Sequence, residues 1–188
     1  MKTRKQNGFT IVELLIVVVV IAILAAITLV TYNGIQQRAQ NTQFLSAFDT
    51  YEKALRLYKI TYGEYPRAVN GSGLGVYSCL GGNYPATGNL AADQCFKSGG
   101  LVLGEKVSAV DVELRKVVNQ LPALNYPLLS DTDADSGIVT QSRGIMFQSE
   151  LPPNAILFYF TTGDAPCGRG VKVYDAVANT SSCRIDLP

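Results

Sequence analysis

The sequence has no histidine and only four cysteines among its 188 residues. Without histidine, a Ser-His-Asp or Cys-His catalytic arrangement is impossible. The sequence also lacks a C-x-x-C pair, a G-x-S-x-G elbow and a Walker-type phosphate loop, so the common redox, zinc, hydrolase and nucleotide-binding motifs are absent. Paired carboxylates could supply acid and base without histidine, but no spacing singles out such a pair. We therefore expect the protein not to be an enzyme.

Charge is sparse as well. Charged residues make up 16% of the chain, against about 25% in a typical protein. The formal net charge is +1, and removing the first eight residues takes away three of the 16 basic residues and no acidic one. Such a near-neutral chain lacks the basic surface of a dedicated nucleic-acid binder.

One long apolar run, residues 9–30, accounts for much of the 47% hydrophobic content. As a helix, it would extend about 33 Å, enough to cross a bilayer core of about 30 Å. Lys2, Arg4 and Lys5 precede the run, and the positive-inside rule keeps such a basic leader in the cytoplasm. The sequence therefore predicts a single membrane span, with the rest of the chain outside the cytoplasm.

Glu13 is the only carboxylate within this run. An acidic side chain at the centre of a membrane helix costs about 2.5 to 3.5 kcal/mol, so it calls for a functional reason. Cleavage between Gly8 and Phe9 would create a cationic α-amine four residues before Glu13, on the same helix face. We therefore predict that processing at Gly8 supplies the charge that Glu13 lacks.

The basic leader, residues 8–10, Glu13 and Leu14 together resemble the processing signature of type IV prepilins and the related pseudopilins. The resemblance implies that a prepilin peptidase cuts after Gly8 and methylates the amine of Phe9. It implies that Glu13 neutralises the N-terminus of a neighbouring subunit during filament assembly. It also implies an α+β pilin fold, and a path from the cytoplasmic membrane, through a membrane assembly machinery, to an extracellular filament of pilin subunits.

Other interpretations stay open. A secretory signal peptide has a shorter apolar core and an A-x-A cleavage site, which Ala25 and Ala26 match poorly. A plain signal anchor that tolerates Glu13 is the stronger alternative. Within the resembled family, the chain could be a major pilin, a minor pilin or tip adhesin, or a pseudopilin of a type II secretion-like system. Adhesion, motility and DNA uptake are the corresponding roles, and the surface or DNA target is open.

The helix is predicted to continue through a second, amphipathic half, residues 31–62. Aromatic and apolar residues recur there every three or four positions, which places them on one helix face. They are Phe44, Phe48, Tyr51, Leu55, Tyr58 and Tyr62, with Ala47 and Ala54 beside them. On another face, Asp49 precedes Lys53 and Glu52 precedes Arg56, each as a favourable i,i+4 pair.

Two glycines mark special points of this helix. Gly63, followed by Pro66, is predicted to end it. Gly34 costs about 1 kcal/mol relative to alanine, and we predict that the helix melts near residues 32–34 when a filament forms.

The remainder, residues 63–188, is predicted to form a head with a small antiparallel sheet. Gly, Ser, Asn and Pro are frequent over 63–107, which predicts a long irregular connection. Ser108 and Asp111 resemble a variant capping box, which predicts a helix over 108–121. Three or four antiparallel strands are expected within 137–187. The candidate segments for these strands are 138–141, 145–149, 155–160, and the terminal segments 171–174 and 183–187.

The four cysteines, an even number outside the membrane, predict two disulfides in one of three connectivities. We favour Cys79 with Cys95 and Cys167 with Cys183, since the second bridge would clamp the last strands of the sheet. Each closed loop of about 16 residues would contribute roughly 3 kcal/mol in the chain-entropy model.

The alternating aspartates Asp131, Asp133 and Asp135 are the one candidate metal site. Such a run can direct oxygens around Ca²⁺, as in an EF-hand loop. However, Ser136 and Ser142 stand where an EF-hand has glycine and glutamate. The resemblance adds that some pseudopilins bind calcium in this region of the head. A solvated acidic turn is the alternative, and apart from this possible Ca²⁺ we expect no cofactor.

Overall fold

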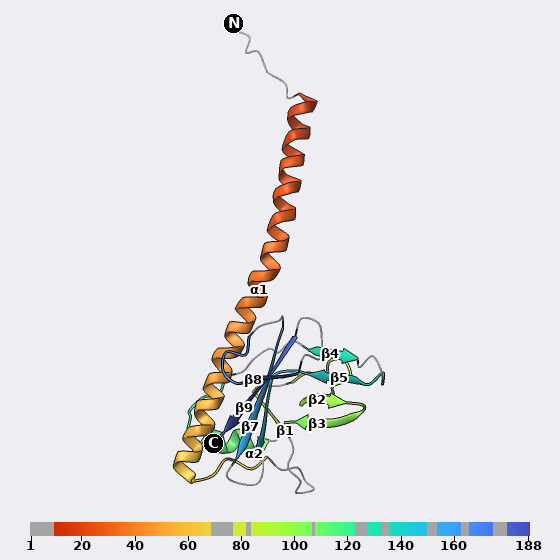
Figure 1. Ribbon diagram of the computed structural model, residues 1–188. Coiled ribbons are helices and arrows are strands. Elements are labelled where there is room, and N and C mark those ends of the chain that lie inside the picture. Colours follow the sequence, from red (N-terminus) through yellow and green to blue (C-terminus); the bar gives the residue numbers. More distant parts are fainter. Residues whose placement is uncertain are drawn as a thin grey trace. The chain divides into compact units, whose positions relative to one another are not determined.

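The computed structural model describes residues 10–68, 77–81, 84–106, 108–122, 128–132, 136–149, 154–162, 166–174 and 180–188, without the side chains of 28–33, 37, 131, 174 and 180. The chain forms two compact units that divide after Gln40. As far as it is described, the first unit is one stretch of helix. The second unit contains the end of the same helix, a short second helix and the sheet (Figure 1).

Helix α1 runs from Ile11 to Tyr62 and passes Gly34 without interruption. Its end follows from Gly63, whose N–H donates to the carbonyl of Lys59 at 2.7 Å. Gly63 has a φ of 85°, the left-handed conformation that glycine adopts readily at a helix C-terminus. The predicted long helix is confirmed over 11–62, and melting near Gly34 within a filament stays a prediction.

The second half of α1 buries the stripe that its periodicity predicts. Phe44, Ala47, Phe48, Tyr51, Ala54, Leu55 and Tyr58 are all buried. Tyr62 is the exception, with 49% of its surface exposed. The ring of Phe48 lies 4.4 Å from that of Tyr159, between centroids, so the stripe packs directly against the sheet. Aromatic pairs at this separation stabilise a core beyond their buried area.

Nine strands among the described residues form one sheet, in the order β4-β5-β2-β3-β1-β6-β7-β9-β8. Every neighbouring pair is antiparallel except β1 with β3, which is parallel. The strands are β1 (Tyr77–Leu80), β2 (Gln94–Ser98), β3 (Leu101–Glu105), β4 (Leu129–Thr132), β5 (Val139–Ser142), β6 (Ile145–Ser149), β7 (Ala155–Thr162), β8 (Val171–Tyr174) and β9 (Thr180–Leu187).

This sheet corrects two predictions. The segment 63–107 is not an irregular connection, because it contributes β1, β2 and β3. The sheet is also larger than the three or four strands expected, and β4 begins before residue 137. The reason is that these short strands pair with distant segments, β1 with β6 and β2 with β5, so local composition does not reveal them.

Helix α2 covers only Ser108–Leu114, and the predicted helix over 108–121 is therefore too long. After Leu114 the backbone tightens, since Lys116 and Val117 donate to carbonyls three residues earlier, as is common at helix ends. Two β-branched valines and an asparagine follow, and these residues favour a helix less than alanine does. The segment still packs into the protein, because Val110, Leu114 and Leu121 are buried.

The two faces of the sheet carry different cores. Along β7, Ala155, Leu157 and Tyr159 belong to the large core that includes the α1 stripe, while Phe160 belongs to a smaller cluster with Met146. This alternation follows from the strand geometry, which points successive side chains to opposite faces. In Figure 1, β2 to β5 lie away from α1, and the smaller cluster joins them to the rest of the sheet through the Cys79–Cys95 disulfide.

Candidate functional site

The predicted assembly site begins at the first turn of α1. Thr10 donates to Glu13 Oε2 twice, from its backbone N–H at 2.9 Å and from its hydroxyl at 2.6 Å. In return, the N–H of Glu13 donates to Thr10 Oγ1 at 3.3 Å. This reciprocal arrangement is a capping box, which satisfies backbone donors that a helix start leaves unpaired. The carboxylate of Glu13 is therefore held at the N-terminal end of α1.

The apolar side chains that follow are exposed within the described structure. From Ile11 to Ile27, the large apolar side chains have exposed fractions between 48% for Val19 and 86% for Ile11. A soluble protein rarely leaves so continuous an apolar surface uncovered, so such a surface marks an interaction site. We refer to residues 11–27 as the apolar segment.

Across the ranges described by the structure, no helix is both long enough and apolar enough to cross a membrane. The predicted span, 9–30, includes Phe9 and the side chains of 28–30, which fall outside those ranges.

In the second unit, an ion-pair network attaches the C-terminal region to α1. Glu52 is 3% exposed, and its carboxylate lies 2.9 Å from Arg56 Nε and 3.3 Å from Arg169 Nη2. Arg169 also contacts Asp49 Oδ1 at 2.7 Å, and this hydrogen bond to Asp49 raises the pKa of the guanidinium. Asp49 therefore pairs with an arginine that is distant in the sequence. The sequence had predicted a pair with Lys53. Two arginines offset the high cost of burying the Glu52 carboxylate.

Helix α2 is attached to α1 by a second polar contact. The hydroxyl of Tyr58 donates to Glu113 Oε2 at 2.6 Å, and Lys116 donates to Glu113 Oε1 at 2.6 Å. Burial, together with this bond to a carboxylate, raises the pKa of Tyr58 to about 12. Tyr58 is therefore protonated, and able to donate, throughout the physiological pH range.

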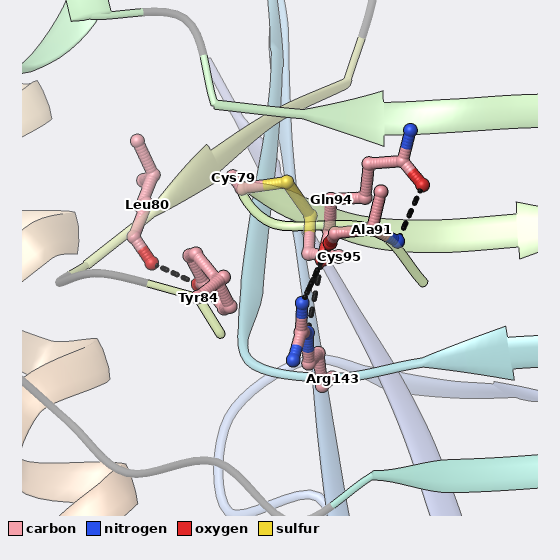
Figure 2. Close-up of a disulfide and its surroundings, with 7 residues drawn as sticks. All are labelled: Cys79, Leu80, Tyr84, Ala91, Gln94, Cys95 and Arg143. Carbon is pink, nitrogen blue, oxygen red and sulfur yellow. Dashed lines mark hydrogen bonds between the residues drawn. A yellow bond between two sulfur atoms is a disulfide. The ribbon is translucent and has the colours of Figure 1, made fainter. Parts of the chain in front are cut away.

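Behind the Cys79–Cys95 disulfide, a buried arginine organises a surface loop (Figure 2). Arg143 is 2% exposed, and burial lowers its pKa. Its guanidinium donates to the backbone carbonyls of Pro85, Ala91 and Gln94. Its own N–H donates to the carbonyl of Cys95 at 2.9 Å, and its guanidinium carbon lies 5.2 Å from the centroid of the Tyr84 ring. Since buried carbonyls are costly when unpaired, Arg143 fixes the loop 84–94.

The structure tests some predicted site residues and not others. Both disulfides, Cys79–Cys95 and Cys167–Cys183, are confirmed. Gly8 and Phe9 lie outside the described residues, as do Asp133, Asp135 and the side chain of Asp131. Among the residues that are described, no three His, Cys, Asp or Glu side chains are close enough to hold a metal ion. Processing and calcium binding therefore stay predictions.

Arg143 and Arg169 were not identified from the sequence, and Thr10 was identified only as part of the processing signature, not as a helix cap. The cap could have been predicted, because a threonine three residues before a glutamate at the start of an apolar run is a capping-box signal. Arg143 and Arg169 carry no such local signal. Their partners lie 49 to 58 and 117 to 120 residues away in the chain.

Comparison with known proteins gives a consistent result for the N-terminal part of the chain. Residues 3–29 match the family described as the prokaryotic N-terminal methylation motif. The chain is 33% identical over 79 residues to a fimbrial protein of Neisseria meningitidis serogroup B, covering 42% of this chain and 46% of that protein. It is 32% identical over 71 residues to the type II secretion system core protein G of Aeromonas hydrophila, covering 38% of this chain and 50% of that protein.

A third relative is the type IV major pilin protein PilE of Neisseria gonorrhoeae, 32% identical over 79 residues, which are 42% of this chain and 47% of that protein. The chain thus spans about half the length of the curated relatives it matches. No solved structure gives a significant match. The methylation motif, these relatives and the α+β architecture agree, and the N-terminal part of this chain is similar to that of type IV pilins and type II secretion pseudopilins.

Proposed function

We propose that this protein is a structural subunit of a type IV pilus or a related filament. The observation that carries the proposal is the apolar segment, whose side chains lie exposed directly after the capped Glu13, inside the part that matches the methylation motif. Its side chains need a cover from outside the chain. Before assembly, lipid of the cytoplasmic membrane would cover these side chains. Within the filament, the same segments of neighbouring subunits would cover them.

Processing is part of this proposal. A prepilin peptidase cuts between Gly8 and Phe9 and methylates the new amine, which then carries a positive charge. Glu13 of a neighbouring subunit neutralises that charge as the subunit enters the filament. Because such contacts are head-to-tail and do not close, they generate an open helical polymer. This role needs no chemistry beyond binding, so the protein is proposed not to act as an enzyme.

Substitution of Glu13 tests the proposal. In cells that assemble the filament, Glu13→Ala should still be cleaved after Gly8, which mass spectrometry of the N-terminus measures. It should lower the amount of sheared filament at least tenfold. Glu64→Ala, which removes an exposed carboxylate just beyond α1, is the matched control and should assemble normally. Normal assembly of the Glu13 variant, or an intact Met1 in the native protein, contradicts the proposal.

A pseudopilin is the second candidate, favoured by the similarity to core protein G of type II secretion systems. A pseudopilin would serve a secretion system rather than form a surface pilus. Immunogold labelling of intact cells separates the two, since only a pilus carries the label beyond the cell surface.

Calcium binding by Asp131, Asp133 and Asp135 is proposed separately. Calorimetry of the full chain in detergent micelles should show heat on addition of Ca²⁺ that Asp133→Asn abolishes. Asp111→Asn, which changes a carboxylate on α2, is the control. Absence of heat at millimolar Ca²⁺, in the affinity range of weak extracellular sites, removes the site.

A further inference from the structure

The part of the sheet that lies away from α1 contains a hollow of about 570 Å³. Two turns border it, the β2–β3 turn at Gly99 and Gly100 and the turn before β5 at Gly137. The N–H of Gly99 donates to the carbonyl of Val139 at 3.3 Å, which joins the two turns. Volumes between about 300 and 1,000 Å³ are typical of small-molecule sites.

The floor of this hollow is built from neighbouring strands. Lys97 on β2 and Gln141 on β5 are directly paired and therefore lie on the same face of the sheet. Asn89 is held between them, because its N–H donates to Gln141 Oε1 at 2.7 Å and its carbonyl accepts from Lys97 Nζ at 3.1 Å. Gln141 is only 8% exposed. These groups are fixed before any ligand arrives, which reduces the entropic cost of binding.

The turn that presents Asn89 is rigid for independent reasons. Thr87 and Leu90 exchange two backbone hydrogen bonds, of 3.0 and 3.1 Å. A Cβ at Gly88 would lie 2.8 Å from Leu128 Cδ2, so the turn is packed closely against its neighbours. Arg143 holds the same loop through the carbonyls of Ala91 and Gln94, next to the Cys79–Cys95 disulfide (Figure 2).

The chemistry of the lining is that of a donor-rich site. The ammonium of Lys97 has three hydrogens, of which one donates to Asn89, so two are left for a ligand. A Cβ at Gly100 or at Gly137 would meet no atom of the described residues within 4 Å, which leaves the backbone of both turns open on the described side. No carboxylate occurs among the described residues that line the hollow, and Ile138, 44% exposed, forms an apolar wall.

We propose that this hollow binds a carboxylate-bearing saccharide, with the carboxylate on Lys97 and the sugar ring on the turn backbones and Ile138. A charge-assisted bond to Lys97 fixes the anionic group. The hydroxyls of a sugar suit backbone donors and acceptors, and its C–H face suits the isoleucine side chain. The site is independent of filament assembly, so the filament proposal can fail without affecting it.

Nuclear magnetic resonance of the full chain, isotope-labelled at glycine and held in detergent micelles, tests this site. A chelator is present so that a cation at the aspartate run does not contribute. Glucuronate should shift the amide signals of Gly99, Gly100 and Gly137 saturably, with a dissociation constant of about 1 mM, while glucose should not. Lys97→Gln should weaken binding about tenfold, Lys97→Arg should keep it, and Lys53→Gln, at an exposed lysine of α1, should leave it unchanged.

Several results would overturn the site. The first is no saturable shift in the unmodified protein at about ten times the expected dissociation constant. The second is equal binding by the Lys97→Gln and Lys53→Gln variants, and the third is equal binding of glucose and glucuronate. Inorganic phosphate serves as a separate probe. If it alone shifts these signals, the hollow takes a free oxyanion and the saccharide assignment is wrong.

Discussion

Helix α1 contains two regions that are both rich in apolar residues but differ in what covers them. In the apolar segment, large side chains are exposed by 48% or more. In the stripe from Phe44 to Tyr58, every large member is at most 8% exposed, because the sheet packs on it. The stripe completes the fold of the chain itself. The side chains of the apolar segment are left exposed among the described residues.

The difference lies in the pattern rather than in hydrophobicity. The stripe leaves charged residues such as Lys53 on other faces of the helix, so one side alone packs against the sheet. The apolar segment is apolar all round, with Glu13 as its only charge. A helix of that kind needs cover on every side, as lipid or a bundle of identical helices provides.

Matched truncations in the two regions should give the largest contrast. Phe48→Ala removes a ring that is 2% exposed and should destabilise the second unit by about 3 to 5 kcal/mol. Ile16→Ala removes a side chain that is 56% exposed and should leave that stability unchanged. Denaturant unfolding of the full chain in micelles, followed by tyrosine fluorescence, measures both, since the chain has ten tyrosines and no tryptophan.

Equal destabilisation by the two variants would show that the apolar segment takes part in the fold of the chain. A defect of Ile16→Ala in filament yield, with no loss of stability, would instead sharpen the division between the two regions.

Removal of the C-terminal disulfide should have the next largest effect. The double variant Cys167→Ser with Cys183→Ser opens a loop closed over a separation of 16 residues, which should cost about 3 kcal/mol. The loss is confined to the second unit, so circular dichroism should show the helical signal of α1 largely retained while the unfolding midpoint falls. An unchanged midpoint would mean that the terminal strands are held without the bridge.

The same contrast explains what the sequence could predict. The long helix, its end at Gly63 and its buried stripe depend on local periodicity and local caps, and the sequence predicts them well. The disulfide pairing was also correct, since the strand patterns near Cys167 and Cys183 already indicated a bridge that clamps the last strands. The strands β1, β2 and β3 were missed, since each is four or five residues long and lies among turn-forming residues.

Long-range polar contacts were harder still to predict. Asp49 has a lysine four residues later, yet its carboxylate contacts Arg169, 120 residues away. Arg143 gives no sign in the sequence that it is buried among backbone carbonyls. Such contacts depend on the complete topology of the sheet, and a pattern within one helix or strand does not contain that information.

The contact between Arg169 and α1 should contribute a smaller amount. Arg169→Gln leaves Glu52, which is 3% exposed, with Arg56 alone, and should lower the denaturant midpoint of the second unit by less than removal of the disulfide does. The partly exposed position of Arg169 limits the effect, because exposed ion pairs are weak. Arg67→Gln, at another exposed arginine, should change stability by less than about 0.5 kcal/mol. Similar midpoints for the two variants would mean that Arg56 alone supports Glu52.

The smallest effect should come from Tyr58, through pH. Its pKa rises from 10.0 in the unfolded chain to about 12 in the folded one, so folding favours the protonated phenol that donates to Glu113. The stabilisation is therefore complete below about pH 10 and is lost as the pH rises towards 12. The side chain of its partner Glu113 is 30% exposed, so solvent screens the bond and keeps the effect below about 1 kcal/mol. Denaturant midpoints of the wild type and of Tyr58→Phe should differ at neutral pH and converge across this interval. The apolar segment contains no tyrosine, so convergence of the two midpoints reports on the second unit. A difference between the midpoints that stays constant with pH would contradict the hydrogen bond from Tyr58 to Glu113.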